Sequence, residues 1–298
     1  MIGGIYLHVP FCTAKCPYCD FYSQHGSEVD YDHYLTAMLR AINAFSGTFD
    51  ADTIYFGGGT PVLLGTDRLI VLLDAVRRRF GGRQSEVTLE ANPCAVDEVM
   101  LLRLAKGGFN RISFGVQSMN DATLRVLGRR HTAKRAAEMI WAASCAGFKH
   151  ISADLMLAVP EQHIEEIDAS VRALAALPID HLSAYLLKIE PDTFFAKRYI
   201  DPDEDFSADC YLEMSRAARA TALLSMKFLV SPRMRTHKAN TTLNTGAANL
   251  TLASAPLRTL FTMAIAFISR AICPPFCRRK TLGTPLSTTG RGETRTNA

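Results

Sequence analysis

The sequence predicts an α/β fold built from parallel strands joined by helices. Short apolar segments typical of buried strands recur along the chain, at 5–9, 53–56, 86–90, 111–116, 150–157 and 181–187. Segments with apolar residues at helical spacing lie between them, at 31–45, 67–80, 97–106, 133–146 and 164–176. This alternation, without the turn signals of β-hairpins, is typical of a parallel sheet with helical crossovers.

Glycines support the boundaries of these elements. Glycine pairs or a single glycine follow three of the predicted helices, at 81–82, 107–108 and 147, and glycine commonly ends helices. The strand at 53–56 instead runs into Gly57-Gly58-Gly59-Thr60-Pro61, whose bare backbone allows a ligand to approach closely. The six units can form an open, doubly wound sheet or a partial barrel. In both, ligands bind at the carboxyl ends of the strands.

Composition narrows the class of protein. The chain has 298 residues, and its hydrophobic content of 48% is enough for a large core. Its net charge of +4 is mild and does not favour nucleic-acid binding. Eight irregularly spaced cysteines in a long chain do not favour a disulfide scaffold. Because we find no signal peptide and no apolar run long enough to cross a bilayer, we expect a cytoplasmic location.

Three cysteines share one short loop directly after the first strand. Cys12, Cys16 and Cys19 are spaced by four and three residues. Iron–sulfur clusters and structural zinc sites normally take four thiolates. Three thiolates without an obvious fourth suggest a [4Fe–4S] cluster with one iron open to another ligand. The alternatives are ordinary thiols or half of a zinc site.

Polar residues fall near the carboxyl ends of the predicted strands. Glu90 ends the third strand, Gln117 follows the fourth and Asp154 lies within the fifth. Glu90 alone is also compatible with a solvated strand end, as the glycine loop is with a structural turn, and Gln117, Arg129 and Asp154 are each uninformative alone. Together with the cysteine loop, they predict one pocket for a polar cofactor.

Several segments resemble, in order, the radical S-adenosylmethionine (SAM) proteins of the oxygen-independent coproporphyrinogen oxidase group. The cysteine segment Tyr6-Leu7-His8-Val9-Pro10-Phe11-Cys12 to Cys16-Pro17-Tyr18-Cys19 carries the resemblance first. It continues at 56–61, 89–93, 110–118, 127–131, 154–156, 183–185 and 189–193, and so covers roughly residues 4–215.

This resemblance implies a partial (β/α)6 TIM-like barrel of the radical SAM type. It implies that the three cysteines hold three irons of a [4Fe–4S] cluster, and that SAM chelates the fourth iron. An electron from the cluster would cleave the S–C5′ bond of SAM. The residues that the resemblance places in contact with SAM are Tyr6, Tyr18, Gly58, Gly59, Thr60, Glu90, Gln117, Arg129 and Asp154.

Phe21 separates two branches of this group. The true oxidases resemble C-x-x-x-C-x-x-C-x-C, and Phe21 stands at the position of the last cysteine. This favours the heme chaperone branch, called HemW, whose members bind heme as cargo and pass it to respiratory proteins. The implied partners are heme, heme-accepting respiratory proteins and an electron donor for the cluster, with membrane contact only through those acceptors. The alternative is an oxidase that decarboxylates coproporphyrinogen, so enzymatic activity stays open.

The resemblance ends near residue 215. We therefore expect a radical SAM core over 1–215 and an aberrant, poorly ordered segment over 216–298. The family's C-terminal motifs, including a His-Asn-x-x-Tyr-Trp heme motif, are absent from that segment. They are permitted when codons 226–261 are read from their third base, which predicts a frame change near 216–220. His237 and Asn240 would then not be heme ligands, Cys273 and Cys277 would have no role, and the product could be inactive.

Overall fold

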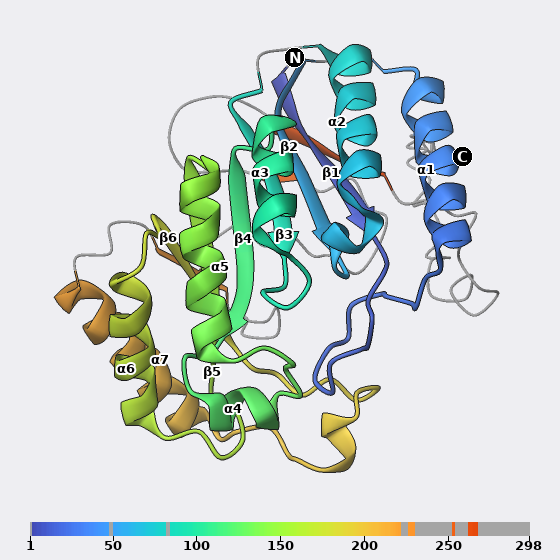
Figure 1. Ribbon diagram of the computed structural model, residues 1–298. Helices are drawn as coiled ribbons and strands as arrows, with labels where there is room; N and C mark the ends of the chain where they lie inside the picture. The colour runs from blue at the N-terminus through green and yellow to red at the C-terminus, as the bar shows by residue number, and fades with distance from the viewer. Residues whose placement is uncertain are drawn as a thin grey trace, which may run out of the picture.

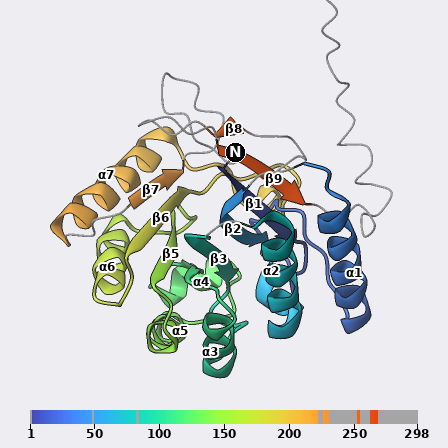
Figure 2. The same ribbon diagram turned by 90° about the horizontal axis from the view of Figure 1, so that it is seen from above.

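The computed structural model confirms the alternating α/β fold and describes residues 2–47, 50–81, 84–221, 226–229, 252–253 and 262–267. Its central strands are β1 (Ile2–Val9), β2 (Asp50–Gly58), β3 (Glu86–Ala91), β4 (Arg111–Gln117), β5 (His150–Leu157) and β6 (His181–Leu186). Each of these strands lies parallel to, and beside, the strand that precedes it in the chain. The sheet curves into a partial barrel (Figure 2).

Helices cover the outer, convex side of this curved sheet (Figures 1 and 2). They are α1 (Glu28–Ala44), α2 (Thr66–Phe80), α3 (Glu98–Lys106), α5 (Ala133–Ala146) and α6 (Ile164–Ala175). All five lie within three residues of the ranges that the periodicity predicts. Their N-termini follow ordinary capping chemistry: Thr132, for example, accepts the N–H of Arg135 at the start of α5.

Four shorter or later elements were not predicted from the sequence. They are the 3₁₀ turns η1 (Pro61–Leu64) and η2 (Phe195–Lys197), the six-residue helix α4 (Asp121–Val126) and the helix α7 (Glu204–Ala220). α4 is too short for a clear helical period. α7 extends past residue 215 and buries Met214 and Ala217 on the same side, so the helix is continuous across the end of the resemblance.

Three strands belong to the C-terminal segment. β7 (Met226–Leu229) lies parallel to β6, and β9 (Thr262–Phe267) lies parallel to β1 with β8 (Leu252–Ala253) antiparallel beside it. They extend the sheet at both edges, to the order β7-β6-β5-β4-β3-β2-β1-β9-β8. His237, Asn240, Cys273 and Cys277 lie outside the described residues, as does most of the segment for which we expected poor order.

The central strands place apolar and polar side chains on opposite faces. Ile5, Leu7 and Val9 of β1 are buried in the same hydrophobic core as the helices outside the barrel. The intervening residues Tyr6 and His8 face the other way, because successive side chains of a strand alternate. The same alternation directs Tyr55, Glu90, Ser113, Asp154 and Ser183 to the inner face, where hydrogen bonds and electrostatic contacts link them.

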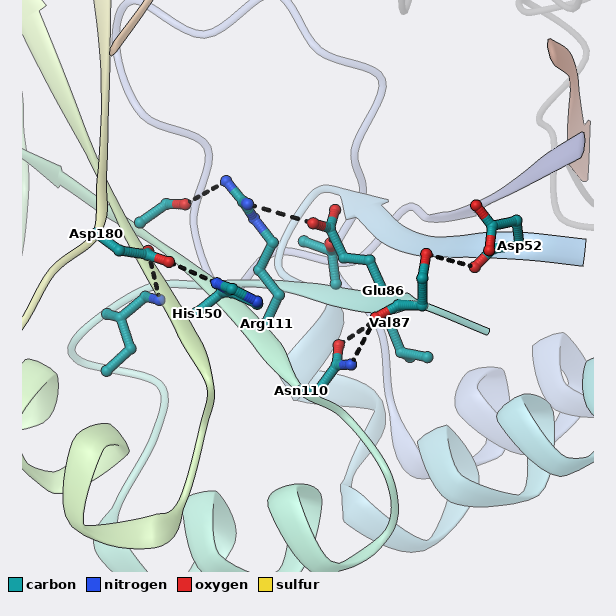
Figure 3. A network of polar contacts seen from close by, with 11 residues as sticks. Asp52, Glu86, Val87, Asn110, Arg111, His150 and Asp180 are labelled. Carbon is teal, nitrogen blue, oxygen red and sulfur yellow. Dashed lines mark hydrogen bonds and ion pairs between the residues drawn. The ribbon is translucent and has the colours of Figure 1, made fainter. Parts of the chain in front are cut away.

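A separate polar network joins the amino ends of the strands (Figure 3). Arg111 forms an ion pair with Glu86 (Nη1–Oε2, 3.3 Å) and donates to Ser152 Oγ (2.7 Å), which links β3, β4 and β5. His150 Nδ1 lies 2.5 Å from Asp180 Oδ2 and extends the network to the start of β6. These contacts hold the strands in register at the end opposite to the predicted pocket, and so leave the carboxyl ends free for function.

Candidate functional site

The cysteine loop is fixed at its base. Cys12 donates its N–H to Gln24 O (3.0 Å), and Gln24 donates its N–H to Pro10 O (2.7 Å), so the two arms of the loop pair like short strands. Phe11 is fully buried and packs edge-on against Tyr31 and Tyr34, with ring centroids 4.8 and 5.5 Å apart. The aromatic packing keeps the first cysteine at the end of β1.

The three predicted ligands lie together on this loop as free, partly buried thiols. Burial raises the pKa of Cys19, and the neighbouring Cys16 and Cys12 raise it further, so the thiols interact. Cys19 also donates its N–H to Cys16 O at 3.1 Å. In the part of the chain that the structure describes, no three ligand side chains are arranged for a single metal ion. A [4Fe–4S] cube takes each thiolate on a different iron, and so requires a wider spacing than one ion does.

The glycine loop after β2 lies directly against the cysteine loop. Gly59 donates its N–H to Val9 O (2.8 Å), and Thr60 donates its N–H to Phe11 O (2.7 Å). Thr60 Oγ1 also lies 3.6 Å from Cys12 Sγ. A Cβ atom on Gly59 would lie 2.5 Å from Phe11 O, which is closer than real Cβ atoms approach. Glycine is therefore required at this position for the two loops to touch.

Glu90 connects β3 to the glycine loop. Tyr55 donates its hydroxyl to Glu90 Oε1 (2.6 Å), and Gly58, with a φ of 117°, donates its N–H to Glu90 Oε2 (3.1 Å). Burial raises the pKa of Glu90, while these two hydrogen bonds act in the opposite direction. The sequence identifies Glu90 and Gly58 but misses Tyr55, which the structure shows to be a direct partner of Glu90.

The resemblance implies that Glu90 contacts SAM, and on that basis we expect Tyr55→Phe to weaken SAM binding while leaving cluster assembly intact. The substitution keeps the ring but removes the hydrogen bond to Glu90, whose carboxylate then holds Gly58 less firmly. A loss of about 1 kcal/mol, or roughly fivefold in affinity, is the expected size of one such bond. Isothermal titration of SAM into the cluster-loaded protein measures the affinity. An affinity equal to that of the unchanged protein would show that Glu90 needs no such support.

Arg129 links the cysteine loop to β4. Its Nη1 lies 3.6 Å from Cys16 Sγ and 3.5 Å from Tyr18 Oη, and its Nη2 donates to Gly115 O. Burial lowers the pKa of Arg129, but Tyr18 and Cys16 beside it raise it by more, so the side chain stays charged. Gly128 before it has a φ of 66°, which turns the chain from α4 toward the loop.

Two buried polar atoms at this point have no hydrogen-bond partner within the described residues. They are Arg129 Nε and Gln117 Oε1, one a donor and the other an acceptor. Gln117 also has a φ of 68°, an uncommon conformation for a residue other than glycine. Buried polar groups are normally hydrogen-bonded, so an unpaired donor and acceptor in one pocket indicate that a polar ligand completes the site.

Asp154 is the second buried carboxyl group among the predicted site residues. It accepts a hydrogen bond from Ser113 Oγ at 3.3 Å. Burial raises its pKa to about 7, and the nearby Glu90 carboxylate contributes. Two carboxyl groups that face the same interior therefore titrate as a pair in which one holds its proton more firmly.

This shift predicts a stability that depends on pH. The folded protein keeps a proton on Asp154 up to about pH 7, whereas the unfolded chain releases it near pH 4. Because the folded state binds more protons in this range, stability falls as the pH rises from about 4 to 7, and the loss is complete above pH 7. We expect Asp154→Asn to reduce this fall, leaving only the part that the Glu90 carboxyl contributes, and to be about 2–4 kcal/mol more stable than the unchanged protein at pH 8. Urea unfolding at pH 5 and pH 8 measures it, and parallel pH dependences in both proteins would refute it.

Tyr6 and Tyr18 complete the predicted set of site residues. The ring of Tyr6 stacks on Tyr55 (5.8 Å between centroids), and its hydroxyl lies 3.2 Å from His8 Nδ1. His8 Nε2 in turn contacts Tyr22 O at 3.1 Å, so the imidazole bridges β1 and the cysteine loop. Tyr18 approaches Arg129 as described above. His8 belongs to the same aromatic cluster and was not predicted as a site residue; its inward phase on β1 is the signal that could have found it.

Residues 6–174 match the family described as the Radical SAM superfamily. The chain belongs to the Radical SAM superfamily. The match covers the cysteine loop, the glycine loop and every residue that the sequence placed near SAM. A [4Fe–4S] cluster and SAM are the cofactors that this family implies.

Sequence relatives narrow the branch. The chain is 40% identical over 217 residues to the protein "Heme chaperone HemW" of Escherichia coli (strain K12). This match covers 70% of this chain and 57% of that protein. It is 37% identical over 196 residues to the protein of the same name from Bacillus subtilis (strain 168), and that match covers 64% of this chain and 52% of that protein. This radical SAM chain thus spans little more than half the length of the curated relatives it matches.

A solved structure gives the same result for the fold. Coproporphyrinogen III oxidase (HemN) from Escherichia coli, a radical SAM enzyme, superposes with a TM-score of 0.67 at 26% identity. The superposition covers 74% of this chain and 52% of that one. The predicted partial (β/α)6 barrel of the radical SAM type is confirmed.

The residues present fit the cofactors that the family implies. SAM carries an amino group, a carboxylate and ribose hydroxyls, and the unpaired Arg129 Nε and Gln117 Oε1 are the complementary donor and acceptor. Arginine is well suited to bind a carboxylate. The three clustered thiols are the ligands that iron–sulfur clusters take.

Proposed function

We propose that the chain is a heme chaperone-like radical SAM protein. Cys12, Cys16 and Cys19 hold a [4Fe–4S] cluster, and SAM lies between the glycine loop, Glu90, Gln117, Arg129 and Asp154. The chain binds heme as cargo and delivers it to respiratory proteins. The observation that supports the cofactor sites most directly is Arg129, which reaches Cys16 while keeping an unpaired buried Nε.

The protein's own residues act mainly by positioning. When bound, the cluster supplies one electron to SAM. Glu90 and Tyr55 hold the glycine loop against the cysteine loop, and Arg129 places a positive charge beside Cys16. Since such a cluster requires a reducing compartment, we propose a cytoplasmic location. No helix among the described residues is long and apolar enough to cross a bilayer.

An oxidase that decarboxylates coproporphyrinogen is the second candidate. The observation in its favour is the likeness to the coproporphyrinogen oxidase structure. Phe21 weighs against it, because an exposed phenyl ring stands where the resemblance to true oxidases requires a further cysteine. We therefore favour the chaperone.

The C-terminal segment decides whether the chain can both bind heme and deliver it. We propose that 1–215 is the radical SAM core and that 216–298 is translated out of frame, which accounts for the family motifs found in the alternative reading. A chain without the heme-handling half of its relatives is the third candidate, an inactive fragment, and it predicts that the purified protein binds no heme even after its cluster is reconstituted. Sequencing the coding DNA across codons 210–230 tests the frame change, and a continuous frame without an insertion or deletion would disprove it.

The proposed function is tested on the full chain after anaerobic cluster assembly. We expect the reduced cluster to give an EPR signal that changes on SAM addition, and we expect Cys16→Ser to abolish it. Heme should bind and then transfer to an apo-cytochrome, measured by its Soret band. Coproporphyrinogen should not be turned over; its decarboxylation would favour the oxidase instead.

A further inference from the structure

A hollow lies beside the cysteine loop, outside the proposed SAM site. It has two adjoining parts, of about 330 and 390 Å³, which share Glu161, Arg198 and Tyr199. The segments that follow β4, β5 and β6 form its walls, and Pro17, between Cys16 and Tyr18, lines the part nearer the loop. This size is within the range of pockets that bind small molecules.

The part nearer the cysteine loop is apolar and aromatic. Phe195 packs edge-on against Tyr199 (5.1 Å between centroids) and against Tyr18 (6.0 Å), and its N–H donates to Pro17 O at 3.1 Å. Phe194 beside it keeps 60% of its surface exposed. Phe195 itself is buried and supports this wall, so the exposed ring of Phe194 is the surface on which another flat molecule can stack.

Two arginines in the same hollow have no anionic partner. Arg125 and Arg198 both line it, and among the described residues neither makes an ion pair or a side-chain hydrogen bond. The guanidinium of Arg198 stacks over the Tyr199 ring at 5.2 Å, which holds it at the edge of the hollow. The one acid in the lining, Glu161, accepts the hydroxyl of Tyr199 at 3.2 Å. The hollow therefore presents an apolar face together with two available positive charges.

We propose that this hollow binds a flat apolar molecule with two carboxylates, of the tetrapyrrole class to which heme belongs. The proposal rests on the proposed function, because it identifies a place for the cargo on the radical SAM core itself. The tetrapyrrole ring lies against the exposed ring of Phe194, and its carboxylates pair with Arg125 and Arg198. Arginine suits this task because its guanidinium binds carboxylates through two parallel hydrogen bonds. Contact with Pro17 places the molecule against the loop that carries the cluster ligands.

The experiment is a heme titration of the cluster-loaded full chain, followed by the Soret band. We expect Arg125→Gln and Arg198→Gln each to weaken binding about five- to tenfold, and the double variant about 50-fold, since each removes one charge-assisted pair. The matched control is Arg78→Gln, which removes an exposed charge from α2 and should leave the affinity unchanged. The dimethyl ester of protoporphyrin, which lacks free carboxylates, should bind more weakly than protoporphyrin and should not respond to the arginine variants.

The possible results separate this proposal from the proposed function. Equal heme affinity in the double variant, or equal binding of the ester, would overturn the hollow as the site while leaving heme binding in place. If the unchanged chain binds no heme but SAM still alters the EPR signal of its cluster, the hollow is refuted and the radical SAM part stands. Heme that binds in the hollow but never reaches an acceptor would refute delivery alone. Another segment of the protein could fill the hollow and exclude heme from it. Heme binding would then not respond to the arginine variants, and this result would also overturn the proposal.

Discussion

Replacing Gly59 with alanine is expected to prevent cluster assembly while the sheet still forms. The new Cβ would lie 2.5 Å from Phe11 O and 3.0 Å from Phe11 C and N. These are backbone atoms, so no side-chain rotation relieves the overlap. Phe11 cannot retreat, because its ring is fully buried between Tyr31 and Tyr34. The two loops must therefore separate, which breaks the bonds from Gly59 to Val9 O and from Thr60 to Phe11 O.

The separation moves Cys12 relative to the other two thiols, because Cys12 follows Phe11 directly. We expect a stability loss of about 2–4 kcal/mol and an iron content after reconstitution below roughly a fifth of normal. Circular dichroism reports the fold, and iron and sulfide analysis reports the cluster. The control is Gly147→Ala, where the φ of 96° strains the alanine but no atom lies within 4 Å of its Cβ. That variant should lose about 1 kcal/mol and keep its cluster. A normal iron content in the Gly59 variant would show that the contact of the two loops is not needed.

The fold could be predicted because each of its units is local in the sequence. A strand, its following helix and the glycines that end the helix lie within a few tens of residues. The spacing of apolar residues and the positions of glycines are therefore enough to predict these elements. The strand-end residues were also predictable, because parallel strands all present their carboxyl ends at one edge. Glu90 and Gln117 were found in this way. The strands that the C-terminal segment adds at the sheet edges could not be predicted, because that segment has no sustained period.

The contacts inside the site were less accessible to sequence reasoning. Tyr55 was treated as part of an apolar strand, although its phase, two residues before Gly57, places it on the inner face with Glu90. Reading each strand for polar residues at alternate positions would have identified it, and His8 as well. The approach of Arg129 to Cys16 spans 113 positions and depends on the left-handed turn at Gly128. No local pattern encodes such a contact, since it exists only after the sheet and the loop have formed.

Substituting Arg129 with glutamine is expected to abolish tight SAM binding without emptying the cluster site. The variant loses the charge beside Cys16 and Tyr18, the hydrogen bond to Gly115 O and the unpaired Nε. A charge-assisted hydrogen bond contributes about 1.5–3 kcal/mol, so two such contacts to SAM amount to a loss of roughly 100-fold or more in affinity. The three cysteines are unchanged, and iron content should therefore stay near normal.

Lysine at the same position separates charge from geometry. Arg129→Lys keeps the positive charge. Its single ammonium group cannot replace all three roles of the planar guanidinium, which donates to Gly115 O, lies beside Cys16 and keeps a further N–H for the ligand. We expect its SAM affinity to lie between those of the unchanged protein and the glutamine variant, at about tenfold below normal. Titration calorimetry gives the affinities, and the EPR change on SAM addition shows whether the ligand reaches the cluster. If lysine restores full affinity, Arg129 acts through its charge alone. If glutamine binds SAM normally, the unpaired Nε does not face the ligand, and the assignment of Arg129 to the SAM site is wrong.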